Sequence, residues 1–101
     1  MPVAHFSNDQ FAKAKESGLV RELDGFKTYE EWHKGHVENV QELVERGYRV
    51  AIVEIDVDEF LEWKKALTYP MKWGLATYTA GLMRNGQKIL KWHYWKPAGF
   101  P

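Results

Sequence analysis

Cationic and aromatic side chains gather in one stretch near the carboxy-terminal end of the chain. The stretch comprises Lys88, Lys91, Trp92, His93, Tyr94, Trp95 and Lys96. Lysines can neutralise the phosphates of single-stranded nucleic acid while aromatic rings stack on its bases. The same rings could anchor a protein partner, because large aromatic side chains dominate the energetics of many interfaces. We therefore predict that these seven residues form the binding surface.

Residues 89–95 are rich in aromatic side chains, which favours a strand. Successive side chains of a strand point to opposite faces. One face would carry Lys88, Leu90, Trp92, Tyr94 and Lys96, and the other Ile89, Lys91, His93 and Trp95. Each face combines rings, a lysine and apolar residues. The alternative to a binding surface is an edge strand with one buried face and protective lysines.

Two histidines, His33 and His36, lie three residues apart in a segment with helical periodicity. Both fall within its apolar arc, with His33 close to the centre of the arc. Such a pair could hold a metal from two directions. A third ligand would have to come from His93, His5 or Glu30. Neutral histidines that are hydrogen-bonded within a core or contact surface are the interpretation we favour, so we predict no metal and no cofactor. Their inward placement also makes them candidates for a pH-sensitive contact.

A group of carboxylates follows the most apolar run of the chain: Glu54, Asp56, Asp58 and Glu59. Carboxylates at the end of a strand could bind Mg²⁺ and support a metal-dependent hydrolase. Asp56, however, has the position of a helix N-cap with Glu59 three residues later, and acidic residues favour the first turn of a helix. Only Glu54 is left without a structural role.

Other catalytic signatures are absent from the sequence. The chain has no cysteine, and neither of its two serines, Ser7 and Ser17, has a glycine on both sides. It contains no phosphate-binding glycine loop and no metalloprotease helix motif. We predict no catalytic residue and expect a protein that is not an enzyme.

Charge is unevenly distributed along the chain, although the formal net charge is +0. Residues 1–62 hold all 14 acidic residues and seven basic ones, whereas residues 63–101 hold seven basic residues and no acidic ones. This asymmetry is typical of a surface for a polyanion. The alternative is that the two halves neutralise each other in the folded state.

The elements that must position these residues are organised around the apolar run at 48–55, which we predict to be a central strand covered on both faces. Helix starts with capping spacing occur at Ser7, Thr28 and Asp56. The segment 73–84 is ambiguous, because Thr77-Tyr78-Thr79 favours a strand while its apolar spacing favours a helix, which we prefer. A strand there would give a three-stranded sheet with 89–95, whereas a helix would favour dimerisation through an edge strand.

The predicted fold is a small single α+β domain over 1–101, with three to four helices around the central strand (48–55) and a second, carboxy-terminal strand (89–95). The chain shows neither a secretory signal nor a membrane span, so we expect a cytoplasmic protein with no membrane partner. The predicted function is non-enzymatic binding of a macromolecule, through a protein partner or self-association. Nucleic-acid binding through the carboxy-terminal third is the alternative, and a metal-dependent hydrolase at Glu54, Asp56 and Asp58 is the third hypothesis.

Overall fold

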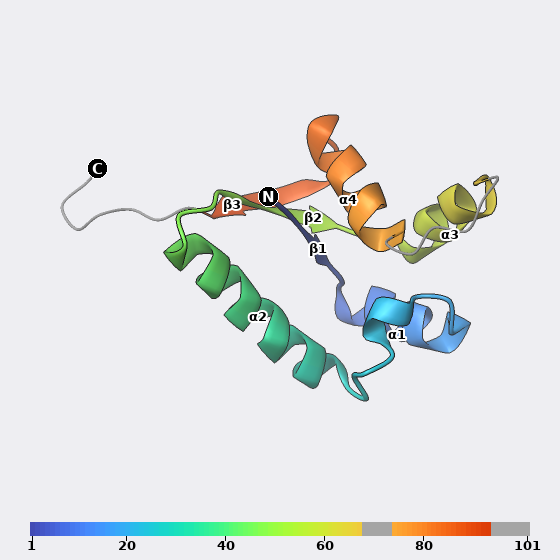
Figure 1. Ribbon diagram of the computed structural model, residues 1–101. Helices are drawn as coiled ribbons and strands as arrows, with labels where there is room; N and C mark the ends of the chain where they lie inside the picture. Colours follow the sequence, from blue (N-terminus) through green and yellow to red (C-terminus); the bar gives the residue numbers. More distant parts are fainter. Residues whose placement is uncertain (68–73, 94–101) are drawn as a thin grey trace.

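Three short strands lie at the centre of the molecule with helices around them (Figure 1). The computed structural model describes residues 1–67 and 74–93. In chain order the elements are β1 (Pro2–His5), α1 (Asn8–Ser17), the short 3-10 helix η1 (Arg21–Leu23), α2 (Tyr29–Glu45), β2 (Val50–Glu54), α3 (Val57–Lys65), α4 (Gly74–Arg84) and β3 (Ile89–His93). The described residues form an α+β domain, which confirms the predicted fold class.

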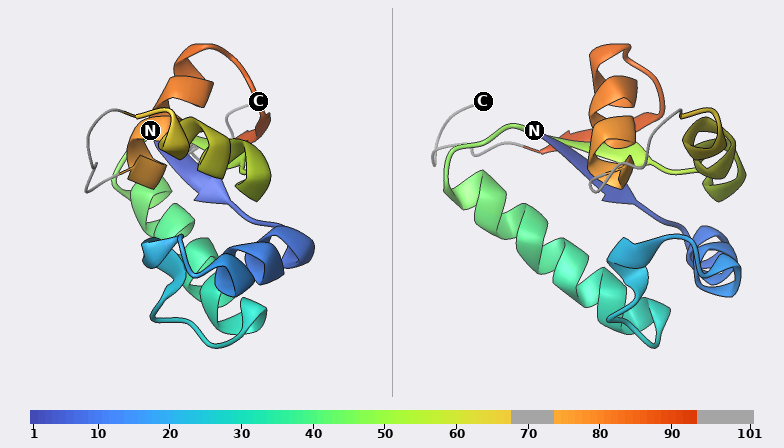
Figure 2. Two further views of the ribbon diagram at one scale, coloured as in Figure 1. Left: turned by 90° about the vertical axis from the view of Figure 1, so that its right-hand side faces the viewer. Right: turned by 45° about the vertical axis from the view of Figure 1, so that its right-hand side comes forward.

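The central strand of the sheet is β2, which pairs with β1 in parallel and with β3 antiparallel. Helix α4 covers one face of this sheet and α2 lies on the other (Figures 1 and 2). Alternate side chains of β2 serve the two faces. Ala51 and Val53 belong to the larger core on the α4 side, and Val50 and Ile52 to a smaller cluster with Val40 of α2. Every residue of β2 except Glu54 is buried, as predicted for a strand covered on both faces.

The three predicted helix starts are confirmed by their capping contacts. The side chains of Ser7, Thr28 and Asp56 accept hydrogen bonds from backbone N–H groups three residues later, at 3.2, 3.2 and 3.0 Å. Each bond satisfies a donor that has no partner within the helix. These helices therefore begin where local chemistry places them.

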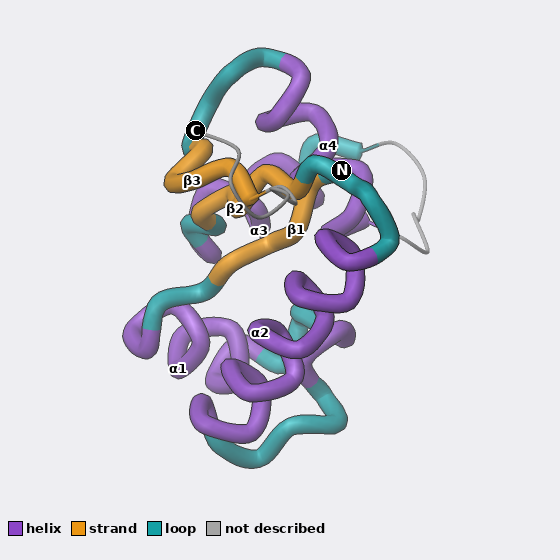
Figure 3. The backbone as a smooth tube through the Cα atoms, turned by 90° about the vertical axis from the view of Figure 1, so that its left-hand side faces the viewer, coloured by secondary structure: helices purple, strands orange, loops and turns teal. Residues whose placement is uncertain are grey.

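Helix α2 is held at two separate places. Near its start, Tyr29 and Trp32 pack against Phe11 of α1, with ring centroids 5.8 and 6.1 Å apart. Near its end, Leu43 and Val44 pack against the small cluster on β2. The helix approaches the sheet at its carboxy-terminal end and diverges from it toward α1 (Figures 1 and 3). Part of that face of the sheet is consequently left without a close cover.

The predicted elements match the structure with limited differences. The central strand covers Val50–Glu54 rather than 48–55, and the ambiguous segment is helix α4. The second predicted strand is present as Ile89–His93, and residues 94 and 95 lie outside the described part of the chain. The third strand of the sheet is β1, which the sequence analysis did not predict. None of the described helices combines the length and apolar character needed to cross a bilayer.

An irregularity in β3 changes which side chains share a face. Val53 pairs with Ile89 and Ile52 pairs with Lys91, so Leu90 has no counterpart on β2. Such an extra residue is a β-bulge, which interrupts the alternation of side chains. Leu90 and Lys91 both lie on the α2 side, whereas Ile89 packs against the larger core. The predicted grouping of Ile89 with Lys91 on one face is therefore wrong.

Candidate functional site

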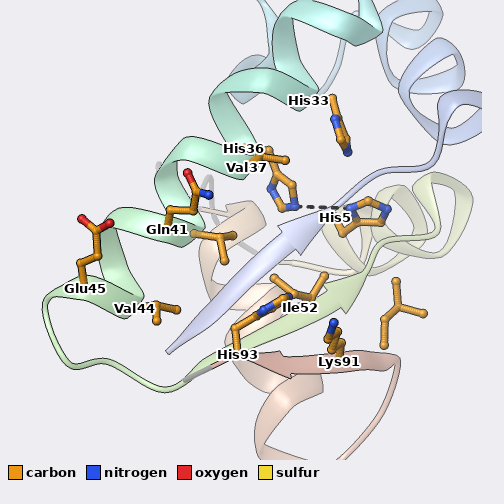
Figure 4. Close-up of a pocket in the computed structure, with 12 residues that line it drawn as sticks. His5, His33, His36, Val37, Gln41, Val44, Glu45, Ile52, Lys91 and His93 are labelled. Carbon is orange, nitrogen blue, oxygen red and sulfur yellow. Dashed lines mark hydrogen bonds between the residues drawn. The ribbon is translucent and has the colours of Figure 1, made fainter. Parts of the chain in front are cut away.

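A groove lies between α2 and the sheet, where the helix diverges from the strands (Figure 4). Its volume is about 580 Å³. The apolar part of its lining comes from one side of α2 and from β2 and β3: Val37, Val40, Val44, Ile52 and Leu90. Val37 and Leu90 are 40% and 54% exposed, so apolar surface in the groove faces solvent. An open apolar surface with a few polar groups is typical of a ligand site.

All four histidines of the chain line this groove. His5 comes from β1, His33 and His36 from α2, and His93 from β3 (Figure 4). His5 and His93 reach it from the two outer strands because both point toward the α2 side of the sheet. Four residues that are far apart in sequence thus contribute imidazole rings to one surface.

The closest contact among the histidines joins β1 to α2. His5 Nδ1 and His36 Nε2 are 3.4 Å apart, at hydrogen-bonding distance (Figure 4). The indole ring of Trp32 stacks on His36, with ring centroids 4.8 Å apart and planes 20° apart, and its centroid is also 6.0 Å from that of His5. The rings of His5, Trp32 and His36 therefore form a cluster in which each contacts the other two.

Burial is the main cause of a large shift in the pKa of His36, which falls to about 4. Repulsion from His5, His33 and His93 lowers this pKa further. The pKa of His5 is also lowered, by burial and then by His33, against a smaller opposing effect of Glu54. Desolvation disfavours the charged imidazole, so both rings of the pair are neutral near neutral pH.

A neutral pair of this kind has a fixed set of hydrogen-bonding groups. Each neutral imidazole carries one proton, and one of the two protons bridges the rings. If His36 donates to His5, the proton of His5 is on Nε2; if His5 donates to His36, the proton of His36 is on Nδ1. In either arrangement the pair keeps one further N–H donor and one further nitrogen acceptor.

The groove residues do not form a metal centre in the described part of the chain. Across residues 1–67 and 74–93, no group of three or more His, Cys, Asp or Glu side chains is arranged to hold a metal ion. His33 is exposed rather than central to the buried arc of α2, whose buried residues are Trp32 and Val40. The predicted position of His33 is therefore wrong, because the contacts of α2 with α1 and β2 set which side of the helix faces inward.

Two full charges line the groove, Lys91 and Glu45. Lys91 is directly opposite Ile52 in the strand pairing, beside the exposed Leu90. No ion pair or hydrogen bond joins the Lys91 side chain to another described residue. Glu45 is the last residue of α2, at the far end of the groove from His33 (Figure 4).

The residues of the predicted carboxy-terminal binding surface occupy different places. Lys91 and His93 line the groove, whereas the amine of Lys88 lies 3.9 Å from a carboxylate oxygen of Glu59. Trp92 pairs with Ala51 on the α4 side, where the guanidinium of Arg49 lies 5.1 Å from its ring centroid. Tyr94, Trp95 and Lys96 lie outside the described residues. The groove brings in His5, which only the missed strand β1 could have placed there.

The predicted carboxylate group is divided among separate contacts. Asp56 caps α3, and Asp58 forms a 2.9 Å ion pair with Lys13 of α1. Glu59 lies near Lys88, and Glu54 is exposed. Three of the four side chains therefore have structural contacts, as the capping interpretation predicted for Asp56.

Comparisons of the chain with protein-family models, with curated proteins and with solved structures found no match.

Proposed function

We propose that this protein is a non-enzymatic binding protein and that the groove between α2 and the sheet is its ligand site. The observation that carries the proposal is the combination of exposed apolar side chains and imidazole groups in one groove. Its volume of about 580 Å³ is within the range of roughly 300–1,000 Å³ that is usual for small-molecule sites. The ligand that suits it has an apolar body and a small number of polar atoms.

The dimensions of the groove favour an elongated ligand. From His33 to Glu45, helix α2 rises by about 18 Å along one wall. Val37, Val40 and Val44 follow one another along that wall at spacings of three and four residues, on one side of the helix. An apolar chain or ring system lying along them would remove exposed surface of Val37 and Leu90 from water.

A titration with decanol, followed by amide NMR shifts, tests this proposal. We expect shifts to change for residues on the inner side of α2 and on β3. Leu90→Glu should abolish them, because it places a charge within the apolar lining. Leu19→Glu is the matched control, since Leu19 is 53% exposed, close to the 54% of Leu90, but does not line the groove. Saturable binding that survives Leu90→Glu would place the site elsewhere and contradict the proposal.

The α4 side of β3 supports a second candidate, a protein partner. Trp92 is 39% exposed there beside Arg49, and in the described residues β3 pairs only with β2. An exposed aromatic ring with a neighbouring arginine is typical of an interface anchor. Trp92→Ala should then weaken self-association or capture of a defined partner, measured by light scattering, and leave decanol binding unchanged.

Nucleic-acid binding remains the alternative form of this second candidate, with Lys88, Lys91 and Lys96 as phosphate contacts. The position of Lys88 argues against nucleic-acid binding, because its amine already lies close to the carboxylate of Glu59. Oligonucleotide affinity that falls steeply with salt, and falls further in a Lys88/Lys91/Lys96→Glu variant, would favour it.

A further inference from the structure

We propose that the ligand of the groove is a small organic acid, with its anionic group at Lys91 and its apolar body along α2. This inference rests on the proposed ligand site and adds the chemical class of the ligand. It follows from where the two charges of the groove lie and from the absence of an acidic partner of Lys91 among the described residues.

Lys91 is placed to recognise an anion from within the apolar part of the site. It extends from the sheet opposite Ile52, and the bulge puts Leu90 on the same side directly before it. Its ammonium group has no acidic partner among the described residues. A cation beside apolar side chains complements a molecule in which a carboxylate is attached to an apolar body.

The other charge of the groove does not compete for that position. Glu45 is at the end of α2, beyond Val44, where the chain leaves the helix (Figure 4). Apart from these two charges, the polar lining consists of Gln41 and the four histidines, and neutral imidazole donates hydrogen bonds as well as accepting them. The neutral pair of His5 and His36 keeps one such donor without adding a second charge. The site therefore suits one negative charge better than two.

The histidines provide a second sign of the same preference. The pKa of His36 is lowered first by burial and then by repulsion from His5, His33 and His93, so the groove disfavours a further positive charge. A bound anion would oppose that repulsion and raise the pKa of His36. Because linkage is reciprocal, the anion should also bind more tightly as His36 becomes protonated.

The experiment compares three ligands that share one apolar chain: decanoate and decylammonium, each below its micelle concentration, and decanol below its solubility limit. We expect decanoate to bind about tenfold more tightly than decanol at low salt, because a charge-assisted hydrogen bond adds to the apolar contact. The preference should shrink as salt rises. In Lys91→Met, which keeps an apolar stem, decanoate should lose this advantage while decanol affinity stays the same.

Two controls define the role of Lys91. Lys34→Met removes a lysine from α2 that does not line the groove, and should leave all affinities unchanged. Lys91→Arg keeps the charge and should preserve the preference for decanoate. As an independent readout, the NMR pKa of His36 should rise when decanesulfonate binds, since a sulfonate stays ionised near the low pKa of His36, and should stay unchanged with decanol.

The outcomes separate this inference from the proposed function. Equal binding of decanoate and decanol, lost in Leu90→Glu, would overturn the anion preference and leave the ligand site intact. Tightest binding of decylammonium would overturn it in favour of a cation. Absence of binding by all three ligands would overturn both proposals. If the amide NMR shifts of the groove residues change when the protein alone is diluted, a second copy of the chain occupies the groove. That outcome would also overturn this inference.

Discussion

The two faces of the sheet differ in how completely they are covered. On the α4 side, Ala51 and Val53 join a continuous core that includes Phe60 and Leu75, all of them buried. On the α2 side, the buried cluster is limited to Val40, Val50 and Ile52, and the groove opens beside it. Most of the buried core therefore lies on the α4 side, whereas the α2 side combines a small buried cluster with an open groove.

The contrast has a simple mechanical origin. Helix α2 is attached to α1 through aromatic rings at one end and to β2 through aliphatic side chains at the other. Two attachments at different distances from the sheet keep the helix from lying flat on it (Figure 3). The groove is therefore a consequence of packing and does not depend on a ligand to hold it open.

The largest expected effect comes from removing a ring from the covered face. Phe60 is 1% exposed and packs against the rings of Trp63 and Tyr78, at centroid distances of 6.1 and 5.3 Å. Phe60→Ala should lower the free energy of unfolding by about 3–5 kcal/mol, through lost burial and a residual cavity. Urea denaturation measures this loss. Leu90→Ala on the open face should cost less than about 0.5 kcal/mol. A similar loss of unfolding free energy in both variants would contradict the difference in packing between the two faces.

A matched pair of valines sharpens the contrast at constant chemistry. Val53 is fully buried on the α4 side, whereas Val44 is half-buried at the edge of the groove. Val53→Ala should cost about 2 kcal/mol of unfolding free energy and Val44→Ala less than about 1 kcal/mol. Equal losses by urea denaturation would mean that the groove side is packed as well as the core.

The pH dependence of stability should reveal the imidazole pair on the open face. The pKa of His36 is about 4 in the folded protein and near 6.5 when unfolded, so the unfolded state binds more protons between these values. The contribution of neutral His36 to the free energy of unfolding is therefore fully present above about pH 6.5 and declines as pH falls toward 4. After allowance for the partial exposure of the ring, we expect a loss of roughly 1–2 kcal/mol.

His36→Phe isolates this effect from the titration of carboxylates. The variant keeps a ring against Trp32 and removes the titrating group, so its stability should vary less than wild type between pH 6.5 and 4. Groups that face His36 and influence its charge are His5, His33 and His93, while Glu54 acts on His5. His33→Gln is the control. Because His33 is exposed, this variant should keep most of the change of unfolding free energy with pH. Identical pH profiles for wild type and His36→Phe would refute the assignment.

Loss of a helix cap should have a modest effect on stability, and the effect should be equal on the two sides of the sheet. Thr28 caps α2 beside the groove, and Asp56 caps α3 on the covered side. Thr28→Ala and Asp56→Ala should each cost about 1 kcal/mol by urea denaturation, because one backbone donor loses its partner. Thr28→Ser and Asp56→Asn keep an acceptor and should cost less. A large difference between the two alanine variants would show that the packing of a face also determines its helix starts.

Sequence reasoning succeeded where the cause of structure is local. The caps at Thr28 and Asp56 depend on residues only three positions away, and the apolar run around Val53 requires burial wherever it lies. These features located α2, α3 and β2. The charge-segregated binding function stays a prediction.

The features that could not be predicted from the sequence depend on contacts between distant residues. Strand β1 has only four residues and acquires its identity from pairing with Ala51 and its neighbours, nearly fifty positions later. Without β1, nothing in the sequence could bring His5 to His36. The place of Leu90 was missed for a related reason, because a bulge is a property of how two strands align.

The bulge also makes the neighbourhood of Leu90 and Lys91 sensitive to chain length. On a regular strand these consecutive side chains would be separated by the thickness of the sheet, but here both stand on one side. Deleting one residue before Leu90 in this strand would restore the alternation of side chains. The apolar side chain of Leu90 and the charged side chain of Lys91 would then point to opposite faces of the sheet. The proposed ligand could then no longer contact both side chains at once, although the amino-acid types that would bind it would still be present.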